Sequence, residues 1–115
     1  MGRREISVYT KFDDNQENYK IMAIIYKDVI KYIDLTNNKM IIDMNNDIIT
    51  RENMEYKFDI DLQKNMINIY AKKLKKQFNK KIDTLLVDKN NREYLVRYRL
   101  LDDDMINEYF VKFKN

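Results

Sequence analysis

Residues 54–61 read Met-Glu-Tyr-Lys-Phe-Asp-Ile-Asp, an unbroken alternation of apolar and charged side chains. Successive side chains of an extended strand point to opposite faces of the sheet. The alternation therefore puts the charges on one face and the apolar side chains on the other, namely Met54, Tyr56, Phe58 and Ile60. This pattern predicts a half-buried β-strand.

The same alternation returns at residues 92–101, where Leu95 interrupts the charged face. Here the shared apolar face consists of Tyr94, Val96, Tyr98 and Leu100. Weaker versions of the pattern predict eight further strands, at Ile6–Phe12, Tyr19–Lys27, Val29–Leu35, Lys39–Met44, Ile48–Asn53, Met66–Ala71, Lys81–Val87 and Ile106–Phe113. We therefore expect ten short strands.

Clusters of Asn and Asp separate most of these strands, at 13–15, 36–38, 45–47, 89–91 and 102–104. The chain has no Pro, and its single Gly is Gly2, so the turns must use other residues. Asn and Asp tolerate positive φ better than other non-glycine residues. We expect positive φ at several of Asn37, Asn38, Asn45, Asn46, Asn90 and Asn91.

Regularly spaced strands with turns between them favour an antiparallel meander, either closed into a barrel or folded as a sandwich. We favour a single all-β domain over residues 1–115, a closed barrel of about eight to ten strands, because closure removes exposed sheet edges. Ala71–Lys81 fits two interpretations. Leu74 and Phe78 are spaced as on a helix face, but repulsion between its lysines argues for extended structure, which we expect.

Several of these segments resemble the YwiB-like family of uncharacterised bacterial proteins. The resemblance rests on Ile48–Asn53, on the amphipathic strand after it, on Tyr70, and on Tyr98-Arg99-Leu100 before an acidic turn. It implies a calycin-like, lipocalin-related β-barrel over nearly the whole chain. The family has no established activity to carry over.

The absence of Cys and His excludes most metal and catalytic chemistry. With no internal Gly there is also no glycine-rich loop for a nucleotide phosphate. We therefore expect a protein that is not an enzyme and that holds no cofactor and no metal. The longest apolar run, Ile21–Tyr26, is too short to span a membrane, and no secretory signal is recognisable, so we expect a cytoplasmic location.

A closed barrel suggests a first functional hypothesis, a small apolar or amphipathic anionic ligand bound in its interior. Arg51 would anchor the anion, and tyrosine hydroxyls would orient the ligand, with Tyr56, Tyr70, Tyr94 and Tyr98 as candidates. The alternative is an interior filled by its own large side chains.

A second hypothesis rests on charge. Residues 62–101 carry 11 Lys and Arg against 3 Asp and Glu. This basic segment would bind nucleic acid or an acidic protein partner, through Lys72, Lys73, Lys75, Lys76, Lys80 and Lys81. The alternative is a solvated face paired with the acidic segments. Apolar residues on the more polar faces of their strands, Ile24, Ile41 and Leu95, suggest a homodimer surface or a second sheet.

Overall fold

The computed structural model describes residues 2–102 and 104–113, and within them the regular structure consists of strands alone. The ten strands are β1 Gly2–Phe12, β2 Asn15–Tyr26, β3 Val29–Ile33, β4 Lys39–Asp43, β5 Ile48–Glu52, β6 Tyr56–Asp61, β7 Met66–Ala71, β8 Lys76–Lys89, β9 Glu93–Leu100 and β10 Ile106–Phe113. This confirms the all-β prediction. No helix in the described part of the chain is long and apolar enough to cross a membrane.

The strands form one closed antiparallel barrel in which each strand pairs with its neighbours in the sequence. The first and last strands complete the circle, with Ile6 opposite Phe113 and Lys11 opposite Glu108. The predicted closed meander is therefore confirmed. Hairpin connections suffice to build it, because every pairing except β1 with β10 joins consecutive strands.

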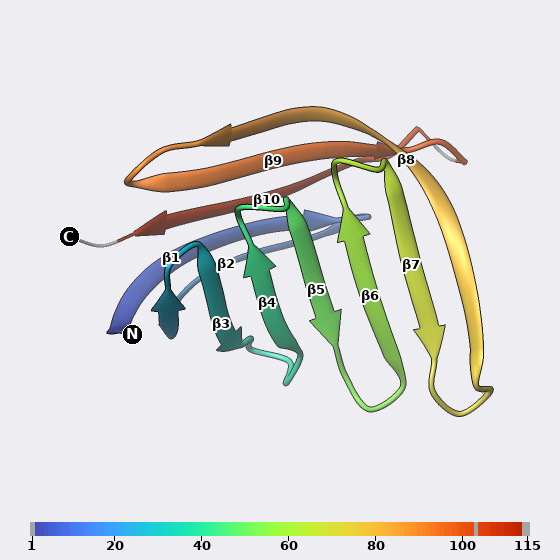
Figure 1. The fold of residues 1–115 in the computed structure, drawn as a ribbon, viewed down its shortest axis with the longest axis horizontal. Helices are drawn as coiled ribbons and strands as arrows, with labels where there is room; N and C mark the ends of the chain where they lie inside the picture. The colour runs from blue at the N-terminus through green and yellow to red at the C-terminus, as the bar shows by residue number, and fades with distance from the viewer. Residues whose placement is uncertain (1, 103, 114–115) are drawn as a thin grey trace.

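The barrel is flattened into two layers that cross one another. β3 to β7 run across the direction of β1, β2, β9 and β10, and β8 curves from the first layer into the second (Figure 1). Residues 76–81 of β8 pair with β7, whereas residues 82–89 pair with β9. The register shifts between Thr84 and Leu86, as expected where a bulge bends a strand.

Alternate residues of the strands fill the space between the layers. Large side chains that are almost wholly inaccessible include Tyr94, Tyr98, Tyr109, Ile6, Ile30, Met40, Ile42 and Ile49. Full burial of each aliphatic side chain stabilises the fold by about 1.5 to 3 kcal/mol before the conformational entropy it opposes is counted. Ile24, Ile41 and Leu95 lie on the outer face, and Ile24 is the most exposed of the three.

The turns use positive φ, but mostly at residues other than those expected. Asn37 has the predicted conformation, with a φ of 63°. The other positions are Asp13, Lys27, Asp47, Asn65, Lys75 and Asp104. The prediction of positive φ at several of the six asparagines is therefore wrong, because Asn38, Asn45, Asn46, Asn90 and Asn91 do not adopt it. The predicted turn at 102–104 includes Asp103, which lies outside the described residues.

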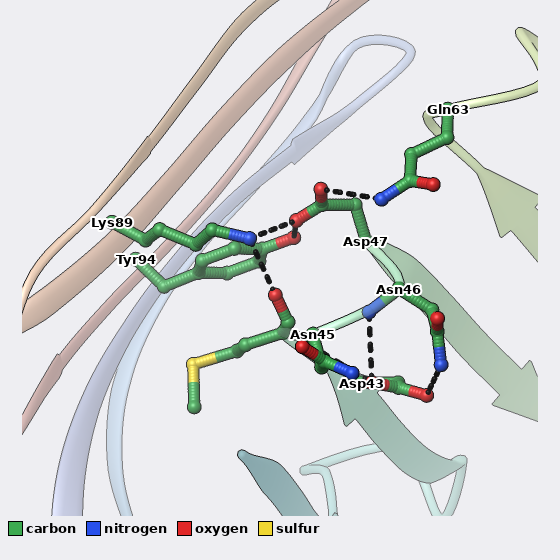
Figure 2. A network of polar contacts seen from close by, with 8 residues as sticks. Asp43, Asn45, Asn46, Asp47, Gln63, Lys89 and Tyr94 are labelled. Atoms are coloured by element: carbon green, nitrogen blue, oxygen red, sulfur yellow. Dashed lines mark hydrogen bonds and ion pairs between the residues drawn. The ribbon is translucent and has the colours of Figure 1, made fainter.

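The β4–β5 hairpin shows why its asparagines keep negative φ. The Asp43 carboxylate accepts hydrogen bonds from the backbone N–H groups of Asn45 and Asn46, both at 3.1 Å, and from the Asn46 side-chain amide at 2.8 Å (Figure 2). The bond from the Asn46 side chain is the main reason that the pKa of Asp43 is lowered. These bonds define an Asx turn, and the left-handed residue that closes it is Asp47.

Most of the predicted strands differ from the structure in at least one bound, and the starts of β6 and β8 are informative. Met54 was expected on the inner face of a strand, but it is 91% exposed in the turn before β6. The Asn53 side chain accepts hydrogen bonds from the backbone N–H groups of Glu55 and Tyr56, and this turn interrupts the alternation. At 71–81 the extended interpretation is confirmed, because β7 ends at Ala71 and β8 begins at Lys76.

Lys75 has a φ of 49° in the β7–β8 turn, where a side chain is disfavoured. We expect Lys75→Gly to raise the free energy of unfolding by about 0.5 to 1 kcal/mol, because relief of this strain exceeds the added entropy of the unfolded chain. Lys76→Gly, one residue later and inside β8, should lower it by a similar amount. Urea unfolding of both variants measures the difference, and destabilisation by Lys75→Gly would contradict the argument.

Candidate functional site: the open end of the barrel

The two layers leave one end of the barrel open. β2 pairs with β3 only through Ile24–Tyr26, so the β3-facing edge of residues 15–23 carries no neighbouring strand. Residues 76–81 of β8 likewise pair with β7 alone. The inner faces of β6, β7 and β8 are therefore uncovered beside these two edges.

Aromatic residues mark this uncovered surface. Tyr56 pairs with Ala71, and Phe78 pairs with Ile69, so both aromatic side chains belong to the inner face of the sheet. Nevertheless Tyr56 is 40% exposed and Phe78 is 48% exposed. They face the concave side of the barrel at a point where no second layer covers it.

A cavity of about 400 Å³ runs inward from this opening. Most of its wall is apolar, and its polar lining residues come from β5, β8, β9, β10 and the turn between β1 and β2. The wall consists of Phe12, Asp13, Arg51, Phe58, Ile60, Ile67, Ile69, Lys80, Tyr98, Leu100, Met105 and Asn107.

Arg51 is one of the two positively charged residues in the wall of this cavity. It sits on the inner face of β5, opposite Met40 on one side and Phe58 on the other. Its guanidinium carbon is 5.7 Å from the centre of the Phe12 ring, within cation–π range. None of the ion pairs formed within residues 2–102 and 104–113 involves Arg51 or Lys80.

A second cavity, of about 510 Å³, also has Arg51 in its lining. All of its lining residues are polar or charged: Asn15, Gln16, Glu17, Thr36, Asn38, Arg51 and Asn53. Arg51 therefore lies at the junction of a largely apolar cavity and a polar one.

Tyr98 and Asn107 form the polar floor of the first cavity. Both are buried, and the Asn107 carbonyl oxygen accepts a hydrogen bond of 3.0 Å from the backbone N–H of Asp13. Burial raises the pKa of Tyr98 to about 12, although the Asn107 side chain opposes the rise. The Tyr98 hydroxyl thus stays protonated at neutral pH and can donate to a ligand.

The opposite end of the barrel is closed by a polar network centred on Asp47 (Figure 2). Its Oδ1 accepts a hydrogen bond of 2.9 Å from the Tyr94 hydroxyl and lies 3.3 Å from the Lys89 ammonium, while Oδ2 accepts one of 3.2 Å from Gln63. Burial and the bond to Asp47 raise the pKa of Tyr94 well above its usual value. Tyr94 is therefore part of a closure, and does not line the cavity.

Further tyrosines occupy the barrel interior between the two ends. The hydroxyl oxygen of Tyr32 lies 2.6 Å from that of Tyr109 and 3.2 Å from that of Tyr19. Burial is the main cause of the raised pKa values of all three, so they remain neutral. These bonds satisfy hydroxyls that would be costly to bury alone.

The structure separates the five predicted ligand-binding residues. Arg51 and Tyr98 line the first cavity, and Tyr94 lies at the closed end. Tyr56 is on the same inner face but is exposed and is not among the residues that line the cavity. The prediction that Tyr70 faces the interior is wrong: Tyr70 pairs with Lys57 and Gln77 on the outer face and is 39% exposed. Its neighbours in β7 are the inward residues, because side chains alternate along a strand.

The predicted basic surface is also divided. Lys72 is held away from the rest by an ion pair of 2.9 Å with Glu52 and by a hydrogen bond of 2.7 Å to the Asn53 carbonyl. Lys73 and Lys75 lie in the turn, and Lys81 pairs with Met66 on the outer face. The expected single face is therefore wrong, because alternation in β8 splits it.

Lys76 and Lys80 are on the inner face of β8, on either side of Phe78. From the sequence, Lys80 was predicted to lie on the basic surface, and no functional role was predicted for Phe78. Lys76, Phe78 and Lys80 are each two residues apart, so a strand over residues 76–81 places all three side chains on the same face, here the concave one.

Comparison of the sequence with protein-family models and with curated proteins finds no match. The resemblance to the YwiB-like family stays a prediction.

Removal of the Tyr94 hydroxyl tests the closed end. Tyr94→Phe should lower the free energy of unfolding by about 1.5 to 3 kcal/mol, the usual range for a hydrogen bond to a charged group. Tyr26→Phe, on the exposed outer face of β2, is the matched control and should change stability by less than about 0.5 kcal/mol. Equal effects of the two substitutions in chemical denaturation would contradict the role given to Tyr94.

Proposed function

We propose that this protein is a non-catalytic binding protein for a small amphipathic anion. The observation that carries the proposal is the position of Arg51, on the inner face of the barrel, between an apolar and a polar cavity, with no carboxylate partner among the described residues. A charged group on an inner face is normally paired, and an anionic ligand would supply the missing partner.

The first cavity suits the apolar part of such a ligand. Phe12, Phe58, Ile67, Ile69 and Leu100 give it an apolar wall, and about 400 Å³ falls in the range of small-molecule sites. Burial of a hydrocarbon chain contributes roughly 0.8 kcal/mol per methylene group. The wall thus provides affinity, and the few polar groups provide orientation.

The charges of the cavity favour a single negative charge on the ligand. Arg51 and Lys80 are positive, whereas Asp13 is a carboxylate on the same wall. Arg51 offers two parallel N–H donors, the geometry that matches a carboxylate or a phosphate. We therefore propose one carboxylate or phosphodiester group, bound at Arg51, with Lys80 as a second cation.

Binding of dodecanoate and of dodecanol, measured by calorimetry below their aggregation concentrations, tests this function. We expect dodecanoate to bind at least about tenfold more tightly, because charge-assisted hydrogen bonds contribute about 1.5 to 3 kcal/mol. Arg51→Gln should remove the difference, while Arg51→Lys should retain part of it. Arg92→Gln, at an exposed arginine, is the control. No binding of dodecanoate, or an unchanged preference in Arg51→Gln, would refute the proposal.

A second candidate function, binding of single-stranded nucleic acid, has one specific observation in its favour. Lys76, Phe78 and Lys80 alternate on an exposed concave surface with Tyr56 nearby, and cations beside aromatic rings suit phosphates and stacked bases. Titration with oligonucleotides across a salt series tests it. Phosphate contacts require affinity to fall steeply with salt, and the absence of binding at low salt would eliminate this candidate.

A further inference from the structure

The polar cavity beside Arg51 defines a second part of the ligand. We infer that the ligand carries, beyond its anionic group, a head group that donates hydrogen bonds through hydroxyl or ammonium groups, and that this head group occupies the polar cavity. The inference rests on the proposed function, because Arg51 orients the anion so that the apolar part enters one cavity and the head group enters the other.

Because Arg51 lines both cavities, we expect the anionic group of the ligand to lie between its apolar part and its head group. Arg51 lines both the apolar cavity and the polar cavity, so an anion held there would border both of them. A simple fatty acid would fill only the apolar side. A ligand whose anion is internal, with substituents on both sides, would use both cavities; a phosphodiester has this form.

Thr36 and Asn38 offer hydrogen-bond acceptors to the polar cavity, because their own side-chain donors are already engaged. The Thr36 hydroxyl donates to Asp34 at 3.1 Å, and the Asn38 amide donates to Asp34 and to the Thr36 oxygen. The Asn53 amide donates to the Asn38 carbonyl oxygen at 3.2 Å. The remaining lone pairs on these oxygens can still accept a hydrogen bond.

Glu17 strengthens this preference. It is half-buried and lines the same cavity, and its carboxylate accepts hydrogen bonds but donates none when ionised. A second negative charge on the head group would be repelled by Glu17. A hydroxyl or an ammonium group would instead bind there.

The loop that forms this wall is held in place before any ligand binds. Asp34 accepts hydrogen bonds of 2.9 Å from the backbone N–H groups of both Thr36 and Asn38, and Asn37 takes the left-handed conformation between them. Asn38 is buried although it is polar. A wall with fixed acceptor positions costs little ordering entropy on binding, which favours selectivity.

Three lysophospholipids with the same lauroyl chain test the inference by calorimetry below their aggregation concentrations. Each is a phosphodiester, and they differ in the head group: glycerol has hydroxyl donors, ethanolamine has an ammonium donor, and choline has no donor. We expect the glycerol or the ethanolamine form to bind roughly three- to tenfold more tightly than the choline form, the effect of about one hydrogen bond.

Glu17→Gln should reduce that preference, most of all for ethanolamine if the ammonium group is the donor. Glu55→Gln, in the exposed turn before β6, is the matched control and should leave it unchanged. If dodecanoate binds but the choline form binds as tightly as the other two, the inference falls and the proposed function stands. If neither dodecanoate nor any lysophospholipid binds, both fall.

Discussion

The division of β8 between two partners is the constraint on which the rest of the fold depends. Its first half continues the layer of β3 to β7, and its second half belongs with β9. The bulge near Leu86 bends the strand from one layer to the other. Because the two layers cross (Figure 1), they cannot cover each other at every corner. The open end beside β2 and the first half of β8 is a direct result of this closure.

The turns show how a chain without internal Gly or Pro reverses direction so often. The side chains of Asp43 and Asn53 each accept hydrogen bonds from the backbone N–H groups of residues that follow them. These bonds stabilise tight turns that in other proteins often contain glycine. Where positive φ is still required, Asp47, Asn65 and Lys75 adopt it. The strain is spread over several hairpins, each stabilised by pairing of the strands it joins.

Period-two alternation predicted the ten strands, because it reports directly which face of a strand is buried. The meander followed from the turns between the strands, and the closure from the need to remove exposed sheet edges. The alternation could not predict which inner-face positions a second layer covers. Tyr56 and Phe78 have the correct parity and yet remain exposed, since coverage depends on how the two layers cross. Tyr70 was wrongly predicted to face the barrel interior, because a tyrosine side chain is compatible with either the inner or the outer face of a strand. Arg51 and Lys80 line the same cavity although they come from β5 and β8. No local sequence pattern predicts that two such distant residues share a cavity.

The charged groups at the two ends of the barrel differ in whether a side chain of opposite charge lies beside them. At the closed end Asp47 has Lys89, Tyr94 and Gln63 as partners, and the network is complete within the protein (Figure 2). At the open end Arg51 has an aromatic ring on one side and no carboxylate partner in the described part of the chain. The first arrangement satisfies the Asp47 carboxylate within the protein, whereas in the second the described residues give the guanidinium a cation–π contact with Phe12 and no ion pair. The inward Arg51, which has no carboxylate partner among the described residues, is therefore the feature on which we base the proposed anion-binding function.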